Sequence, residues 1–98
     1  MAAETLPVIF RKWDDGEVVA LFPTVPFDLD RSCASYMHIG QHGAANYHFV
    51  IGSTRSAKPE EYMPLFQELQ VVGYEGLKVY QRATRKMHDE RNIRALVE

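Results

Sequence analysis

The chain has a single cysteine, Cys33, among its 98 residues. One thiol cannot form a disulfide within the chain, so the sequence gives no sign of an oxidising compartment. No apolar run comes near the roughly 18 residues that a membrane helix needs. The N-terminus, "MAAETLPVIF", lacks both a basic start and a long apolar segment, so no signal peptide is predicted. We therefore expect a cytoplasmic protein that is not bound to a membrane.

Internal repeats and low-complexity segments are also absent from the sequence. The apolar fraction of 46% and the charged fraction of 24% are ordinary for a globular protein and argue against disorder of the whole chain. A length of 98 residues fits one domain. We expect a single domain over residues 1–98, in which residues 85–98 form a terminal helix that frays.

The net charge of −2 is unevenly distributed along the chain. Residues 1–30 carry six acids and two bases, whereas residues 78–94 carry six bases and two acids. A basic segment of this kind is typical either of a solvated helix or of a surface that contacts nucleic acid. We favour the solvated helix and keep nucleic-acid binding as an alternative.

Two apolar segments near the N-terminus predict a β-hairpin. Residues 6–13 are rich in β-forming residues, and an Asp-Asp-Gly turn separates them from "EVVALFP". Asp-Gly between two such segments is a strong hairpin signal. Pro23 and Pro26 are expected to end the second strand, because proline cannot donate to a β-ladder. Residues 24–31 would then form an irregular connection. Two of its apolar side chains are expected to pack against the core: Phe27 and Leu29.

The middle of the chain predicts a second pair of strands. We expect strands over residues 32–39 and 47–54, with residues 40–46, "GQHGAAN", as the loop between them. Gly40 and Gly43 are expected to adopt backbone angles that other residues resist.

The C-terminal part predicts helices around one more strand. A helix is expected to begin at Pro59, which suits the first helical position, and to end before Gly73. Its apolar residues have the spacing of one helical face, at positions 62, 65, 66, 69 and 72. A strand over 76–83 and a helix over 85–96 follow. The order β-β-β-β-α-β predicts an α+β fold, with an antiparallel sheet, one amphipathic helix packed on one face and a short C-terminal helix.

The stretch "SYMHIGQHGAANYHFV" contains three of the four histidines. Because side chains alternate across a strand, His38 and His48 are expected on the same sheet face, opposite each other in a symmetric hairpin. Tyr36 would lie beside them, and His42 at the end of the loop. The other face of these strands is apolar and is expected to meet the helix, which leaves the histidine face uncovered.

An uncovered face that mixes aromatic and polar side chains suits a binding surface. We therefore predict a non-catalytic interaction module that binds a protein partner or a second copy of the chain. The predicted binding residues are Tyr36, His38, Gln41, His42 and His48. Catalytic residues and a cofactor are not predicted.

Two alternatives stay open. Neutral imidazoles bind zinc, so His38, His42 and His48 could form the metal site or the acid–base group of an enzyme. Their spacing matches no specific zinc pattern, and no nucleophile with an orienting acid is apparent. The other alternative is nucleic-acid binding through the basic C-terminal region. Its contacts would come from Tyr80, Arg82, Arg85, Lys86, Arg91 and Arg94.

The segments "YMHIGQHG" and "TRSAKPEEYMPLFQELQVVGYEGLKVYQR" resemble a group of small bacterial proteins that share an aromatic-x-His-x-Gly-Gln-His-Gly turn. These proteins also share a helix that starts with Pro-Glu-Glu-Tyr. The resemblance covers roughly residues 8–88. It implies a free-standing domain of phage or plasmid origin, and no established activity comes with it. Lys58 departs from the expected pattern, because a capping serine or threonine would suit that position.

Overall fold

The computed structural model describes residues 5–27, 32–38 and 40–97. Its elements, in chain order, are β1 (Leu6–Lys12), β2 (Val18–Phe27), β3 (Ser32–Met37), β4 (Gln41–Ala45), α1 (Tyr47–Ser53), β5 (Arg55–Ser56), α2 (Pro59–Val72), β6 (Leu77–Tyr80) and α3 (Arg85–Val97). Among these residues the strands form one open sheet in the order β4-β3-β2-β1-β5, and β6 also pairs with β1. The strand pairs are antiparallel except for β1 with β6, which run parallel. The predicted α+β class is confirmed.

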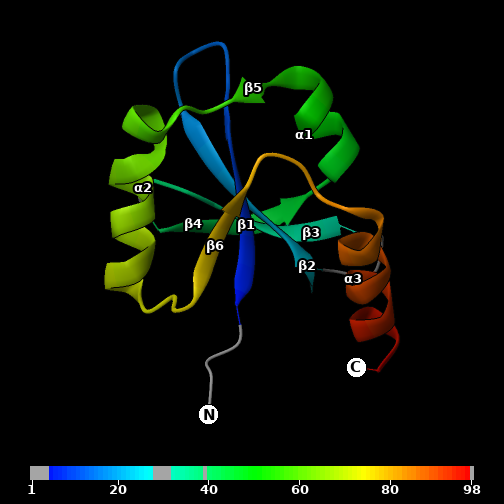
Figure 1. Cartoon of the computed structure of the whole chain (residues 1–98). Coiled ribbons are helices and arrows are strands. Elements are labelled where there is room, and N and C mark those ends of the chain that lie inside the picture. Colours follow the sequence, from blue (N-terminus) through cyan, green and yellow to red (C-terminus); the bar gives the residue numbers. More distant parts are fainter. Residues whose placement is uncertain (1–4, 28–31, 39, 98) are drawn as a thin grey trace.

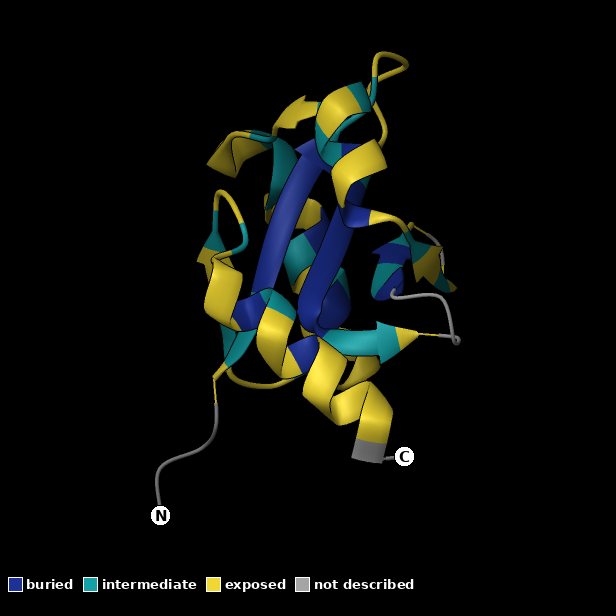
Figure 2. Cartoon of the chain, turned by 90° about the vertical axis from the view of Figure 1, so that its right-hand side faces the viewer, coloured by how far each residue is buried: buried dark blue, intermediate teal, exposed yellow. Residues whose placement is uncertain are grey.

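Helices lie on both sides of this sheet, with α2 on one side and α1 and α3 on the other (Figure 1). The core under α2 consists of Val8, Phe10, Ala20, Phe22, Tyr36, Leu65 and Leu69. The core of the opposite face, under α1, consists of Ile9, Val19, Leu21, Cys33, Tyr47 and Val50. Buried residues therefore concentrate along the central strands, between largely exposed helices (Figure 2). In the described part of the chain, no helix combines the length and apolar character needed to cross a membrane.

The predicted N-terminal hairpin is present. β1 and β2 pair from Ile9 with Leu21 to Lys12 with Val18. The Trp13 N–H donates to the Glu17 oxygen at 2.8 Å, and Gly16 between them has a φ of 94°. A glycine in the left-handed region lets this short loop close without strain.

The second strand continues further than expected. β2 passes through Pro23 and Pro26, so the prediction that these prolines end the strand is wrong. Its pairing with β3 shifts register between Phe22 and Pro26. Prolines are tolerated at such an irregularity because the ladder bonds are interrupted there. Phe27 is 37% exposed and does not pack in the core, and Leu29 lies outside the described residues.

Residues 40–54 differ most from expectation. The predicted loop contains β4, and the predicted strand over 47–54 is the helix α1. β4 pairs with β3 from Cys33 with Ala45 to Met37 with Gln41. The Asn46 side chain accepts a hydrogen bond from the Phe49 N–H at 3.0 Å and so caps α1.

Arg11 of β1 holds the other end of α1. It is a buried residue, with only 5% of its surface exposed. Its Nε donates to the Thr54 hydroxyl at 3.0 Å. Its Nη2 donates to the backbone oxygens of Ile51 and Thr54, at 3.2 and 2.7 Å. Burial, together with the charge of Arg82, lowers the pKa of this guanidinium. α1 is therefore fixed by a residue about 40 positions earlier in the chain.

The C-terminal predictions are largely confirmed. α2 begins at Pro59 and ends before Gly73, whose φ is 121° and whose N–H donates to the oxygens of Leu69 and Gln70. The Lys58 N–H donates to the Glu61 side chain, which supports the first turn without a serine or threonine cap. β6 is shorter than the strand predicted over 76–83, and α3 is the expected terminal helix.

Candidate functional site

The turn between β3 and β4 is attached to α2 through Tyr36. This side chain is fully buried on the α2 face of the sheet, so the expected face assignment is wrong. Its hydroxyl donates to Oε2 of Glu68 and accepts from the Gly40 N–H at 3.0 Å. Gly40 has a φ of 66° and sits in the left-handed region, as predicted. One hydroxyl therefore connects the turn, the sheet and the helix.

His38 reaches the same carboxylate from the turn. Its Nδ1 donates to Oε1 of Glu68, and the imidazole remains largely exposed. The hydrogen bond from Tyr36, and after it the one from His38, lowers the pKa of Glu68. The same Glu68 contact raises the pKa of the Tyr36 hydroxyl. A carboxylate held in its ionised form by two donors stabilises structure, and it is poorly suited to accept a proton.

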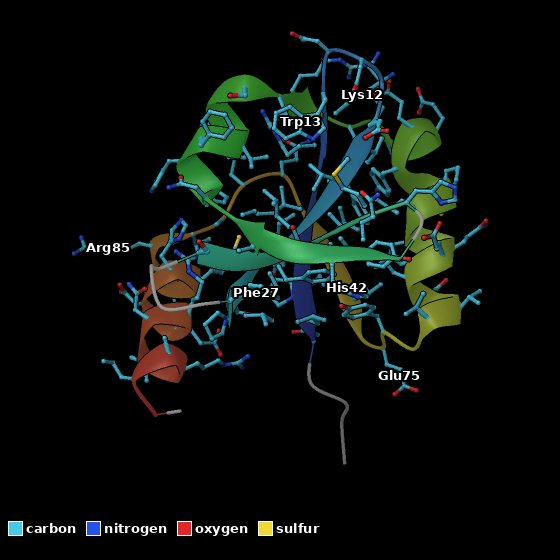
Figure 3. The ribbon with its side chains drawn as sticks, turned by 180° about the vertical axis from the view of Figure 1, so that it is seen from behind. Lys12, Trp13, Phe27, His42, Glu75 and Arg85 are labelled. Carbon is cyan, nitrogen blue, oxygen red and sulfur yellow. The ribbon has the colours of Figure 1, made fainter. Side chains whose placement is uncertain are left out.

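His42 lies on β4 (Figure 3), and it is the cross-strand partner of Tyr36, on the same face of the sheet. The two rings meet edge to face, with centroids 4.7 Å apart. The Nε2 of His42 is hydrogen-bonded to the Tyr74 hydroxyl at 3.1 Å, and Tyr74 stacks on Phe22. Burial raises the pKa of Tyr74. His42 is therefore an exposed side chain held in place by an aromatic group.

His48 does not face His38, because it lies on α1 and not on a strand. Its imidazole stacks on that of His88 from α3, with centroids 5.6 Å apart. Burial lowers the pKa of His88, and the charges of Arg91 and His48 add to this effect. His88 was not singled out from the sequence, since nothing in its local pattern connects it to residues some forty positions away.

The three histidines of the predicted site are thus placed apart. His38 contacts Glu68, His42 contacts Tyr74 and His48 contacts His88. Among the described residues, no group of three or more histidine, cysteine, aspartate or glutamate side chains could hold a metal ion. His38, His42 and His48 therefore do not come together in one shared site.

The open feature of this region is the outer edge of β4. The strand order places β4 at one end of the sheet, where β3 is its neighbour. Gln41, His42 and Ala44 are exposed. In the view from behind, β4 lies nearest the viewer, and no described helix or strand is drawn over it (Figure 3). Its five residues, QHGAA, include neither a proline nor a charged side chain. Natural edge strands usually carry such residues, because they prevent pairing with another chain.

The six C-terminal residues predicted as nucleic-acid contacts have different environments in the structure. Arg91 is buried and donates to the Pro23 oxygen at 2.8 Å. Arg94 donates to Glu90 at 3.1 Å. The Tyr80 ring is half-buried, with the ammonium group of Lys78 5.5 Å from its centroid. Three basic side chains remain exposed and form no ion pair with a described residue: Arg82, Arg85 and Lys86.

Acidic side chains limit what this basic region can bind. A cavity of about 910 Å³ lies between α3 and the ends of β1 and β2. Lys86 and Arg94 line it, but so do three carboxylates, Glu75, Asp89 and Glu90. These carboxylates would repel a phosphate. The exposed Arg85 side chain extends away from the ribbon (Figure 3), and neither Arg85 nor the exposed Arg82 lines this cavity.

Comparisons with family models, with curated proteins and with solved structures found no match to this chain.

Proposed function

We propose that this protein is a non-catalytic interaction module that binds an extended protein segment along the outer edge of β4. The observation that carries the proposal is the open, uncharged and proline-free edge at one end of the sheet. An added strand would satisfy the outward N–H and C=O groups of β4, in the manner of known strand-addition modules. Gln41 and His42 would contact the partner directly.

The surroundings of β4 support this proposal because they hold the edge in position before binding. The Tyr36 hydroxyl connects the preceding turn to Glu68 of α2. The Asn46 cap starts α1 directly after the strand. An edge held in its binding conformation loses little conformational entropy when a partner arrives. Tyr36 is therefore a supporting residue and not a contact residue.

The test introduces a charge at the centre of the edge. Ala44 is exposed, so Ala44→Lys should fold normally and block an incoming strand. The matched control is Val71→Lys on α2, where the wild-type side chain is 88% exposed. Tagged proteins are incubated with lysate of the source cells supplemented with the untagged chain, and the captured proteins are quantified. Wild type and Val71→Lys should capture the same protein, and Ala44→Lys should not.

Two results would contradict the proposal. One is that the wild-type protein captures nothing. The other is that Ala44→Lys captures as much as wild type while giving the same thermal melt.

Phosphate binding at the start of α3 is a second candidate, favoured by the exposed and unpaired Arg82 and Arg85. Binding of this type weakens steeply as salt concentration rises. A gel shift with single-stranded nucleic acid at low salt tests it. The complex should disappear in the double variant Arg82→Gln/Arg85→Gln and persist in Lys58→Gln. Absence of any complex for wild type would exclude it.

We also propose that the protein is cytoplasmic. Cys33 is a free thiol that is fully buried, and burial raises its pKa, so it is unreactive. A single inert thiol is compatible with a cytoplasmic protein. We likewise propose a phage or plasmid origin, which rests on the resemblance to small bacterial proteins.

A further inference from the structure

We infer that the segment which adds to β4 is the β4 strand of a second copy of this chain, paired antiparallel in a register centred on Gly43. This inference rests on the proposed function and adds the identity of the partner.

The β4 strand is complementary to a second copy of itself. Only one antiparallel register pairs all five residues of β4 with those of a second β4. It places Gly43 opposite Gly43, His42 opposite Ala44, and Gln41 opposite Ala45. Each long side chain then faces a small one. The strand contains no lysine, arginine, aspartate or glutamate, and each His42 faces Ala44, so no like charges are placed opposite each other.

In this register, residues that pair across the two copies also lie on the same face of the sheet. His42 lies on the α2 face, where it contacts Tyr36, and alternation places Ala44 on that face too. Ala45 packs with the core under α1, so Gln41 and Gly43 share that opposite face. Residues directly opposite in an antiparallel pair lie on the same side of the sheet. The pairing therefore extends both faces of the sheet continuously into the second copy.

The small residues of β4 also permit the close approach of a second backbone. Gly43 and the two alanines that follow it make up most of β4. A second backbone can therefore come within hydrogen-bonding distance without displacing large side chains. Glycine and alanine offer little side-chain surface for recognising the side chains of an unrelated partner, whereas an identical strand needs only the backbone ladder and the matched pairs.

The opposite side of the sheet is less suited to pairing. β5 has two residues, and β6 has four, including Lys78. Short strands and lysine are the features that discourage edge pairing. A two-fold contact through β4 is therefore favoured. It buries little area, so we expect a weak dimer with a dissociation constant in the micromolar range or above.

Cysteine cross-linking tests directly which residues of the two copies lie opposite each other. Gly43 does not have a positive φ, and a Cβ added there would lie 4.0 Å from the Ser35 hydroxyl, so Gly43→Cys is sterically tolerated. Cα atoms opposite each other in an antiparallel ladder are within disulfide range. Gly43→Cys should form a disulfide dimer under mild oxidation. A mixture of His42→Cys with Ala44→Cys should cross-link more than either variant alone.

Two controls define the background. The native Cys33 is fully buried, so wild type should not cross-link. Gly52 is an exposed position on α1 with open space around it, and Gly52→Cys measures random collision. Sedimentation of the purified protein at high concentration gives the second readout. Wild type and Val71→Lys should show a monomer–dimer equilibrium, and Ala44→Lys should sediment as a monomer.

The outcomes separate the two proposals. A purified wild type that stays monomeric, with no cross-linking of Gly43→Cys above Gly52→Cys, overturns self-pairing. If capture from lysate still depends on Ala44 in that case, strand addition to β4 stands with a different protein as partner. Strong cross-linking of His42→Cys alone, without the mixed product, overturns the Gly43-centred register. Failure of both assays overturns self-pairing and the proposed function together.

Discussion

The Tyr36 hydroxyl in β3 donates to the Glu68 carboxylate in α2, across 32 residues of sequence. The same hydroxyl accepts from the Gly40 N–H in the turn before β4. This one atom therefore couples the helix on one face of the sheet to the position of the edge strand. The contribution of this contact to the stability of the domain can be measured without any partner.

Tyr36→Phe should destabilise the domain, because it removes the hydroxyl while keeping the buried ring. The Gly40 N–H and the Glu68 carboxylate each lose a partner, and the expected loss is about 1–3 kcal/mol in the free energy of unfolding. Urea denaturation measures this loss. Tyr62→Phe is the matched control, since its ring would still stack on Phe10. Equal stabilities of the two variants would mean that the Tyr36 contact contributes nothing.

The Glu68 contacts also predict a dependence on pH. The pKa of Glu68 is lowered in the folded state, so the unfolded chain binds the proton more readily. The stabilisation is therefore present above the ordinary glutamate pKa of about 4.3 and is lost as pH falls through the lower folded value. Thermal melts of wild type and Glu68→Gln over this range should converge as the pH decreases. A difference that stays constant with pH would contradict this role of the carboxylate.

Local signals account for the parts of the fold that were predicted correctly. Asp-Gly between apolar segments located the first hairpin, and Pro59 with Gly73 located both ends of α2. Each of these signals acts through backbone angles of the residues themselves. They hold wherever the segment lies in the fold, which is why sequence alone was sufficient.

The region after Gly40 could not be predicted in the same way. "YHFVI" is rich in β-forming residues, yet α1 forms there because Asn46 caps its start and Arg11 of β1 binds its end. The second contact is a tertiary one and overrides the local preference. Misassigning this segment reversed the faces of β3, so Tyr36 was expected on the surface. His42 and Gln41 are exposed as expected, although on a strand and not in a loop.

The two glycines of the "GQHG" stretch should respond differently to substitution. Gly40 has a φ of 66°, whereas Gly43 lies in an ordinary strand conformation, contrary to our expectation that both are unusual. Gly40→Ala should cost about 1 kcal/mol through backbone strain, and Gly43→Ala should leave the melting temperature unchanged or slightly raised. Thermal melts of both variants test this difference. A larger loss for Gly43→Ala would argue against the strand assignment of β4.

The stacked imidazoles of His48 and His88 should make the protein sensitive to mild acid. The pKa of His88 is lowered in the folded state, so the unfolded chain takes up the proton first. Stability should therefore decrease as pH falls below the ordinary histidine pKa of about 6.5 and continue to fall until the folded group is protonated. His88→Gln should weaken this dependence, and His48→Gln should reduce it less. Melting temperatures measured from neutral pH to pH 5 would refute the argument if wild type and His88→Gln changed in parallel.

Arg11→Met should be among the more damaging single substitutions in this chain. Methionine fills much of the same space, but the backbone oxygens of Ile51 and Thr54 at the end of α1 would lose their donor. Hydrogen bonds from a charged group contribute about 1.5–3 kcal/mol each, so a loss of this order is expected in urea denaturation. Arg11→Lys keeps the charge but lacks the forked donor, so it should recover only part of the stability. Full recovery by lysine would show that charge alone is what α1 requires. Since β4 runs directly into α1, destabilised Arg11 variants should also show faster hydrogen exchange at the β4 amides.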